Sequence, residues 1–361
     1  MPGQIGVGIL GANPDRGWAA RAHVPAIGAS PDFKLAAVAT SRIASARAAQ
    51  ERFGAAHAFT DAASLARHPS VDLVVVTVKV PAHAELVSTA LAAGKHVYCE
   101  WPLARTAGEA RALTVAAERA GVRGVVGLQA RFAPAVARAK RMLAEGAIGE
   151  VLSATLYSSR GKGNTREVPA WTAYTYDDAT GAGLVEVLGG HALDLVQHLL
   201  GPIRELTART TIRRPEHAVA ETGEPIAVTA PDHLLATAEI GGGAVLSVHL
   251  HDGEAALPRT RFEIAGTTGS LALVSVPEPN SWAAQLQIGR LVLHQSHPAD
   301  AQWRQVTVND DAEDNLPVEA VNVARLYRQL AVDLRDGTEV TPTFHAAEAL
   351  HALIDQVPPP R

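Results

Sequence analysis

Residues 94–103 (GKHVYCEWPL) carry the most chemical information in the chain. A short apolar strand is predicted over residues 96–99, and it runs directly into Glu100, Trp101 and Pro102. In a doubly wound sheet, ligands bind where the strands end at their carboxyl edge. We therefore predict that these three side chains face a bound nucleotide.

A glycine-bearing turn follows the first apolar run of the chain. The literal G-x-G-x-x-G match, residues 6–11, lies mostly inside the predicted strand, whereas phosphate-binding glycines must follow the strand and open a helix. Residues 11–17 are the better candidate: Gly11 makes the tight turn, and Asn13 stands where a second glycine is usual, because asparagine tolerates a positive φ. Backbone N–H groups from Gly17 and Trp18 onward would meet a pyrophosphate at the helix N-terminus. An ordinary Gly/Pro turn is the alternative.

The end of the second predicted strand bears on the choice between the two nicotinamide cofactors. A carboxylate there binds the ribose 2′-OH of NAD, whereas an arginine accommodates the 2′-phosphate of NADP. The chain offers Ser41 and Arg42 and no acidic residue at this point. We therefore expect NADP to be preferred over NAD, with both residues as phosphate ligands. Alternatively, Arg42 lies in solvent or stacks on adenine without selecting a cofactor.

A helix predicted over residues 184–200 carries a second group of polar side chains. Helical spacing places four residues on one of its faces: Val187, His191, Asp194 and His198. His191 with Asp194 one turn later could be a general base held by a carboxylate. The alternative is a structural histidine satisfied by the neighbouring acid.

The elements that must position these groups alternate along the first half of the chain. Strands are predicted over residues 5–10, 34–39, 72–78, 96–99 and 122–128, and helices over residues 18–22, 44–53, 82–93 and 107–120. Strands alternating with helices at this spacing indicate a parallel sheet with right-handed crossovers. We therefore assign residues 1–127 to a dinucleotide-binding Rossmann domain.

The second half of the chain changes to the alternation that is typical of antiparallel strands. Strands are predicted over residues 151–157, 234–240, 244–250, 261–265, 271–274, 286–293 and 304–308, with hairpin turns at residues 241–243 and 267–269. Such a sheet has one face to cover with helices and another available for a partner. We expect residues 128–361 to form an α+β substrate domain whose open, mostly antiparallel sheet joins copies into a homodimer or homotetramer.

The composition excludes several classes of protein. With 47% hydrophobic and 19% charged residues the chain is neither disordered nor fibrous. A formal net charge of -5 gives no reason to expect a nucleic-acid partner. The single cysteine, Cys99, excludes an internal disulfide and fits a reducing compartment. Because the sequence shows no secretion signal and no apolar run of about 18 residues, we expect a cytoplasmic protein without a membrane partner.

Several segments together resemble the glucose–fructose oxidoreductase, inositol dehydrogenase and MocA (Gfo/Idh/MocA) family. They are residues 6–12, 23–27, 83–85, 94–97, 99–102, 146–149 and 189–194, and they extend over essentially the whole chain. The resemblance implies a Rossmann domain, a second domain built on an open sheet and a bound nicotinamide cofactor. It also implies a sugar, polyol or related hydroxy substrate.

The chain departs from the family at two positions of the catalytic trio. Members typically carry Glu-Lys-Pro, whose lysine helps to move a proton, and an aspartate four residues before the catalytic histidine. Here these positions hold Trp101 and Val187, while His191 remains. Neither an indole nor an isopropyl group exchanges a proton near neutral pH. The resemblance therefore implies His191 as the principal acid/base in an altered relay.

Further site residues are predicted around these groups. Lys79 follows a central strand where the family commonly has proline, and partial burial would lower its pKa enough to make it a substitute donor; a surface lysine is the alternative. Thr77 and His83 are further cofactor-binding candidates, joining Glu100, Trp101 and Pro102. The candidate substrate-binding residues are Gln129, Arg131, Tyr174, Tyr176 and Asp194.

The resemblance supports two functions. The first is an NAD(P)-dependent oxidoreductase that transfers a hydride between the nicotinamide and a carbohydrate-like alcohol or ketone. The second is a non-catalytic, cofactor-binding regulator, because the branch of the family that represses fungal galactose regulons has similar segments. These are residues 17–19, 100–101, 128–131, 231–235 and 266–269.

Overall fold

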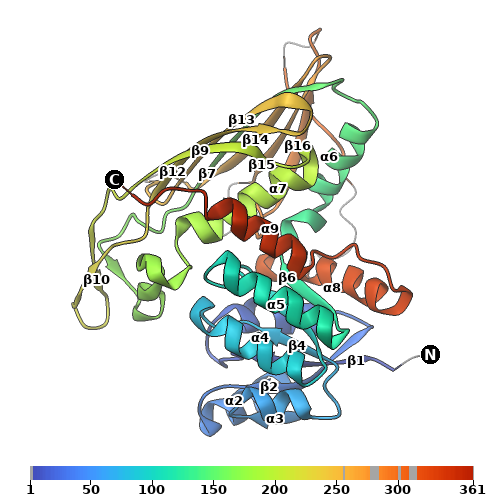
Figure 1. The fold of residues 1–361 in the computed structure, drawn as a ribbon, viewed down its shortest axis with the longest axis vertical. Helices are drawn as coiled ribbons and strands as arrows, with labels where there is room; N and C mark the ends of the chain where they lie inside the picture. Colours follow the sequence, from blue (N-terminus) through green and yellow to red (C-terminus); the bar gives the residue numbers. More distant parts are fainter. Residues whose placement is uncertain (1–2, 255–256, 277–283, 300–301, 309–314, 361) are drawn as a thin grey trace. The chain divides into compact units, whose positions relative to one another are not determined.

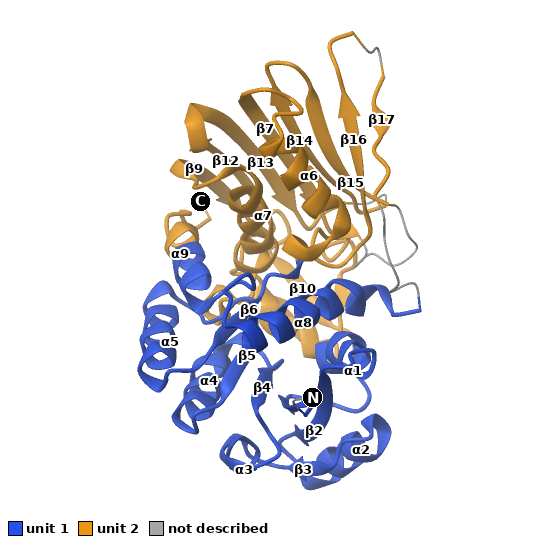
Figure 2. Cartoon of the chain, turned by 90° about the vertical axis from the view of Figure 1, so that its right-hand side faces the viewer, with its two compact units in different colours: residues 1–129, 313–351 blue, residues 130–312, 352–361 orange. Residues whose placement is uncertain are grey.

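The computed structural model describes residues 3–254, 257–276, 284–299, 302–308 and 315–360. The chain divides into two compact units, shown in blue and orange in Figure 2. Unit 1 consists of residues 1–129 and 313–351, and unit 2 of residues 130–312 and 352–361. The sequence prediction drew one boundary, after residue 127, whereas the structure returns the chain to unit 1 near its C-terminal end.

Unit 1 is built on a six-stranded parallel sheet with the strand order β3-β2-β1-β4-β5-β6, which is the Rossmann order. The strands are β1 (Ile5–Leu10), β2 (Phe33–Ala39), β3 (His57–Phe59), β4 (Leu73–Val76), β5 (His96–Glu100) and β6 (Gly124–Gly127). The central strands are fully buried because helices cover both faces, which explains their continuous apolar runs. The predicted parallel sheet is confirmed, although β3 was not anticipated.

The helices of the first stretch of unit 1 connect these strands. They are a π-helical segment (Ala19–His23), α1 (Val24–Gly28), α2 (Ile43–Phe53), α3 (Ala62–Arg67), α4 (His83–Ala92) and α5 (Ala107–Ala120). α5 begins where the Thr106 side chain accepts the Glu109 N–H, and it ends at Gly121, which has φ +62°. The first helical segment continues six residues past its predicted end at Ala22, because Pro25 fits the first turn of α1.

Two helices that the sequence prediction did not contain follow the second unit: α8 (Val318–Asp336) and α9 (Phe344–Ile354). α8 packs against the π-helical segment and α1. Between the two helices, Pro342 accepts the Val126 N–H of β6 at 2.9 Å. Asp333 is fully buried and accepts the backbone N–H groups of Val340 and Thr341. These contacts explain why the returning stretch belongs to unit 1.

Unit 2 is built on an eight-stranded sheet with the order β17-β16-β15-β14-β7-β13-β12-β9. Most of its strands are labelled in Figure 1, and its edge strand β17 is labelled beside β16 in Figure 2. The strands are β7 (Val151–Ser159), β9 (Arg204–Thr211), β12 (His233–Ile240), β13 (Ala244–His251), β14 (Thr260–Gly266), β15 (Ser270–Ser275), β16 (Leu291–Ser296) and β17 (Arg304–Gln305). All neighbours are antiparallel except β7 and β13, so the predicted mostly antiparallel sheet is confirmed. β16 begins five residues later than predicted, and β9 was not predicted.

The eight-stranded sheet presents two different faces. Helices α6 (Pro134–Ala144) and α7 (Gly190–Leu200) lie along one of them (Figure 2). On β12 and β13 the buried residues alternate with exposed ones, and Leu235 and Val245 are 50% and 62% exposed. A small three-stranded sheet, made of β8 (Glu167–Val168), β10 (Glu216–Val219) and β11 (Pro225–Ala227), completes the unit.

Candidate nucleotide-binding and histidine sites

The turn after β1 depends on one glycine. Gly11 has φ +91°, and a Cβ atom on it would lie 2.8 Å from Cγ1 of Val78. Its N–H donates to the carbonyl oxygen of Ala39 at 3.0 Å, which ties the turn to the end of β2. Only glycine therefore fits this position without strain.

In the loop that follows, Asn13 and Gly17 have backbone conformations that differ from the prediction. Asn13 has no positive φ; instead its Oδ1 accepts the N–H groups of Asp15 at 2.9 Å and Arg16 at 3.3 Å. This is an Asx turn, in which the side chain replaces a backbone acceptor. The positive φ lies at Gly17 (+100°), where a Cβ atom would meet open space. The indole N–H of Trp18 is buried and has no hydrogen-bond partner in the described parts of the chain.

Three of the predicted site residues lie at or just after the end of β4, and the structure shows what each of them contacts. The Thr77 hydroxyl donates to the Leu10 carbonyl oxygen at 2.9 Å, so it ties β4 to β1. His83 is buried with its ring nitrogens 2.8 Å and 2.9 Å from two backbone carbonyl oxygens, and burial lowers its pKa. Both residues hold loops in place. Lys79 is exposed, so the partial burial that its predicted role as a substitute donor required is absent.

Glu100 is fixed at the carboxyl edge of the Rossmann sheet by a buried histidine. His23 Nε2 lies 2.9 Å from Glu100 Oε1, and His23 Nδ1 lies 2.8 Å from the Tyr327 hydroxyl. A Cβ atom on Gly127 would lie 2.7 Å from Glu100 Oε2, so β6 leaves room for the carboxylate by having no side chain there. Sequence reasoning assigned no role to His23 or Tyr327, because 304 residues separate this pair.

The residue after Glu100 packs rather than projecting into solvent. Trp101 is 6% exposed, its ring centroid lies 4.6 Å from that of His351, and the Trp101–Pro102 peptide bond is cis. At the end of β2, by contrast, Ser41 and Arg42 are exposed. Arg42 forms no ion pair or hydrogen bond through its side chain with any described residue. An arginine in this situation is available to a phosphate.

The histidine helix of unit 2 begins with a second π-helical segment, Val185–Gly189, which contains Val187 and leads directly into α7. His191 is 4% exposed, and its Nδ1 has no hydrogen-bond partner in the part of the chain that the structure describes. Burial, followed by the positive charge of Arg160, lowers the pKa of His191 to about 3. The imidazole is therefore neutral at physiological pH.

Asp194 does not hold His191, which corrects the predicted base–carboxylate pair. Asp194 is buried, and its carboxylate accepts two hydrogen bonds from Arg131 Nε, at 3.0 and 3.2 Å, and one from Arg131 Nη2. Burial raises the pKa of Asp194, and the Arg131 guanidinium opposes that rise. Arg131, a predicted substrate ligand, is thus committed to a buried ion pair. Gln129 is buried too, and its Oε1 has no partner among the described residues.

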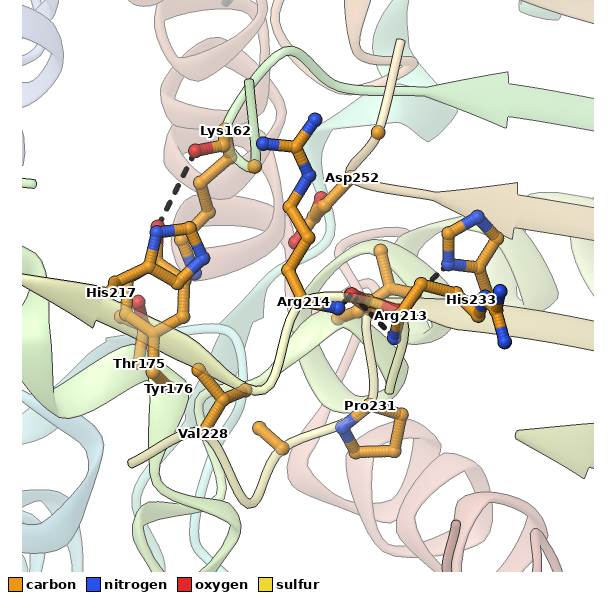
Figure 3. A pocket seen from close by; sticks show the side chains of 15 residues that line it. Lys162, Thr175, Tyr176, Arg213, Arg214, His217, Val228, Pro231, His233 and Asp252 are labelled. Carbon is orange, nitrogen blue, oxygen red and sulfur yellow. Dashed lines mark hydrogen bonds and ion pairs between the residues drawn. The ribbon is translucent and has the colours of Figure 1, made fainter. Parts of the chain in front are cut away.

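Tyr176 lines a pocket of unit 2 (Figure 3). Tyr174 is only half-buried and is not among the residues that line this pocket. Sequence reasoning missed the charged residues of this cavity, which come from four separate loops: Lys162, Arg213, Arg214, Asp232, His233 and Asp252. Two local signals were available in the sequence: the paired arginines at residues 213–214, and segment 231–235, which was noted only for its resemblance to the regulator branch.

The described residues offer neither a metal-binding cluster nor a membrane-spanning helix. Within the described ranges, no three His, Cys, Asp or Glu side chains are placed to hold a metal ion. Among the helices that the structure describes, none is long and apolar enough to cross a membrane.

The two units match the models of two different protein families. Residues 5–128 match the oxidoreductase family with an NAD-binding Rossmann fold, GFO_IDH_MocA. Residues 134–275 match the C-terminal domain of Gal80p.

Individual relatives include both dehydrogenases and regulators. The dehydrogenase AclE of Aspergillus oryzae is 35% identical over 58% of this chain and 58% of its own length. The galactose/lactose metabolism regulatory protein GAL80 of Saccharomyces cerevisiae is 29% identical over 81% of this chain and 70% of its own. Levoglucosan dehydrogenase of Pseudarthrobacter phenanthrenivorans is 28% identical over 74% of this chain and 73% of its own length.

Solved structures show the same two groups. A super-repressor mutant of Gal80p from S. cerevisiae superposes with a TM-score of 0.86, 26% identity and coverage of 98% of this chain and 95% of that one. An oxidoreductase domain protein from Kribbella flavida gives a TM-score of 0.83 at 25% identity, and the match covers 98% of this chain and 96% of that one. Residues 5–128 are therefore similar to the NAD-binding Rossmann domain of the Gfo/Idh/MocA oxidoreductase family, and residues 134–275 are similar to the C-terminal domain of Gal80p.

Proposed function

We propose that the protein is an NAD(P)-dependent oxidoreductase that acts on a carbohydrate-like alcohol or ketone. The observation that carries this proposal is the carboxyl edge of the Rossmann sheet. There Gly11 gives a turn without a side chain, and His23 fixes the Glu100 carboxylate. These residues fit a dinucleotide, with Glu100 as the ligand of the nicotinamide ribose. Ser41 and Arg42 without an acidic neighbour favour NADP over NAD.

The bound nicotinamide would supply or accept the hydride, and the protein would position the substrate. His191 with a pKa of about 3 is a weak base, so it would act mainly as a neutral hydrogen-bonding group toward the substrate hydroxyl. Trp101 replaces the proton-transfer lysine of the family and would form an apolar wall. General acid–base assistance is typically worth about 10²–10⁴-fold. A slow enzyme is therefore the expected outcome.

A non-catalytic regulator is the second candidate function. Two observations favour it: the similarity to Gal80p over 98% of the chain, and the commitment of Asp194 to Arg131. In this case the same Rossmann edge would bind the cofactor and the bound form would be recognised by a protein partner.

Absorbance of the reduced nicotinamide at about 340 nm, followed with a panel of sugars, polyols and keto-sugars, separates the two functions. The enzyme predicts turnover that H191A abolishes while the cofactor dissociation constant stays unchanged. Absence of turnover on every panel member, together with a partner whose binding requires the cofactor, would favour the regulator. For cofactor choice, R42A should weaken NADP binding more than NAD binding; equal affinities of the parent protein for both would contradict the preference.

We also propose that the open face of the eight-stranded sheet joins copies of the chain into a homodimer or homotetramer. The exposed side chains of Leu235 and Val245 on that face support this arrangement. Light scattering at micromolar concentration tests it, and L235K should shift the mass toward the monomer. A monomeric mass of the parent protein would overturn the proposal.

A further inference from the structure

The cavity of unit 2, here called the Lys162 pocket, gathers loops from one end of the eight-stranded sheet (Figure 3). Lys162 follows β7, Arg213 and Arg214 follow β9, and Asp232 and Asp252 flank β12 and β13. Chain segments that are far apart in the sequence therefore bring charged side chains to one opening.

Both carboxylates of the Lys162 pocket already have partners. Asp252 accepts hydrogen bonds from Arg160 Nε at 2.5 Å and Arg160 Nη2 at 2.9 Å. Asp232 accepts the backbone N–H groups of Arg213 and Arg214 at 2.8–2.9 Å and lies 2.7 Å from His233 Nδ1. Neither acid forms an ion pair with Lys162, Arg213 or Arg214.

The cations of the pocket, in contrast, form no ion pair with any described residue, and both Arg213 and Arg214 are exposed. The Lys162 ammonium lies 4.2 Å from the centroid of the Tyr176 ring and forms no ion pair or hydrogen bond with any residue in the described ranges. The guanidinium groups of Arg213 and Arg214 likewise pair with none of the described carboxylates. Three cations and two carboxylates line the pocket, so its formal charges leave an excess of positive charge.

The segment that carries Lys162 packs against the aliphatic part of the Arg214 side chain. A Cβ atom on Gly163 would lie 3.7 Å from Arg214 Cδ and 2.9 Å from the Asp252 carbonyl oxygen, so the Arg214 side chain passes beside the segment that carries Lys162. Figure 3 shows Lys162, Arg214 and Asp252 around the same opening. Burial lowers the pKa of Lys162 to about 8, and the negative charge of Asp252 only partly opposes this shift.

The remaining wall suits the carbon skeleton of a ligand. The rings of Tyr176 and His217 lie 4.6 Å apart, and Leu184, Val228 and Pro231 add apolar surface. Pockets for small molecules combine such walls with a few convergent polar groups.

We propose that the Lys162 pocket binds a small organic anion, with its carboxylate or phosphoryl group between the Lys162 ammonium and the Arg214 guanidinium and its carbon skeleton against Tyr176. The guanidinium fork matches the two oxygens of either group. The Arg160–Asp252 pair connects this pocket electrostatically to His191. The site is independent of the cofactor edge, and its test therefore does not depend on hydride transfer.

Titration calorimetry of the full chain without cofactor, in a buffer free of phosphate and carboxylate, tests the proposal with four probes. These are inorganic phosphate, glucose 6-phosphate, gluconate and neutral glucose. At least one organic anion should bind, while glucose should not bind at the same concentration. A preference for glucose 6-phosphate or for gluconate tells which oxyanion the pocket takes.

Variants localise the binding. R214Q and K162M should each weaken binding by about tenfold or more, whereas K162R, which keeps the charge, should retain most of the affinity. R209Q is the matched control, because Arg209 is an exposed arginine of β9 outside the pocket, and its affinity should equal that of the parent. Circular dichroism confirms that each variant folds.

Three results would overturn the proposal. The first is that no anion binds up to about 10 mM, a concentration that corresponds to negligible affinity. The second is that glucose binds as tightly as the anions. The third is that R214Q and R209Q weaken binding equally, which would indicate only non-specific attraction to positive charge.

Discussion

Two buried histidines stand at the same kind of helix junction in the two units, and they differ in what they contact. His23 ends the π-helical segment before α1, and His191 follows the π-helical segment before α7. Both ring nitrogens of His23 have partners, Glu100 and Tyr327, whereas Nδ1 of His191 has none among the described residues. π-helical turns are rare in proteins as a whole, but those that occur are often found at functional sites.

The difference in partners assigns the two histidines different roles: His23 positions another side chain, whereas His191 has a ring nitrogen that is available to a ligand. A buried polar atom without a partner costs about 1–3 kcal/mol. His23 avoids this cost and orients Glu100. His191 bears it, which is the pattern expected of a group that a ligand completes. Substitution of His191 should therefore mainly affect function, and substitution of His23 should mainly affect stability.

The largest expected effect concerns the ion pair that keeps Asp194 away from His191. R131M should lower the free energy of unfolding by about 3–5 kcal/mol, because it leaves a buried carboxylate without its partner. The double variant R131M/D194L should recover most of that loss. Urea unfolding measures both, and equal losses in the single and double variants would contradict the assignment.

Replacing each histidine in turn tests the comparison directly. H23A should lower the free energy of unfolding by about 2–4 kcal/mol, because it removes two hydrogen bonds and leaves Glu100 and Tyr327 unsatisfied. H191A should cost about 1 kcal/mol or less, because removal of the unpartnered Nδ1 offsets much of the cost of the cavity that the buried ring leaves. If guanidinium unfolding gave similar losses for both, the proposed division of roles would be wrong.

The pH dependence of stability sharpens the contrast for His191. Its pKa of about 3 in the folded protein lies below the ordinary value of 6.5, so below pH 6.5 the unfolded chain binds a proton that the folded chain does not. Stability should therefore fall with falling pH, by about 1 kcal/mol per pH unit below about pH 6. H191A should remove this part of the slope in unfolding curves measured between about pH 4 and 7. An unchanged slope would mean that His191 takes up its proton while folded.

The smallest expected effect on stability concerns the space that β6 leaves for Glu100. In G127A the new Cβ atom would displace the end of the Glu100 side chain, which is flexible, so the free energy of unfolding should fall by only about 1 kcal/mol. The affinity for the cofactor should fall more, because Glu100 loses its contact with His23. G108A in α5, where Cβ meets nothing closer than 3.8 Å, is the control and should leave cofactor binding unchanged. Unchanged cofactor affinity in G127A would contradict the role proposed for Glu100.

The strands and helices around the predicted nucleotide edge could be read from the sequence because their signals are local. β1 and β4 are continuous apolar runs, and α5 has its own caps. β3 was missed because three half-buried residues at a sheet edge give no periodicity. The role of α8 was missed for another reason: it depends on packing against residues about 300 positions earlier.

The side-chain partners of the candidate sites could not be read from spacing. Asp194 is one turn from His191, yet it pairs with Arg131, 63 residues earlier in the chain. Helical periodicity defines a face but not what lies opposite it. The Lys162 pocket likewise joins four loops whose proximity follows only from the order of the strands.

The discontinuity of unit 1 has a consequence for how the protein is made. Ribosomes add about 5–20 residues per second, so residues 1–129 emerge roughly 10–40 s before residues 313–351. During that interval His23 has no Tyr327 and β6 has no Pro342 to accept its Val126 N–H. The nascent Rossmann half must therefore wait, with apolar surface uncovered, until residues 130–312 and the returning stretch of unit 1 have been synthesised. Chaperone dependence and aggregation of truncated chains are the costs expected from this arrangement.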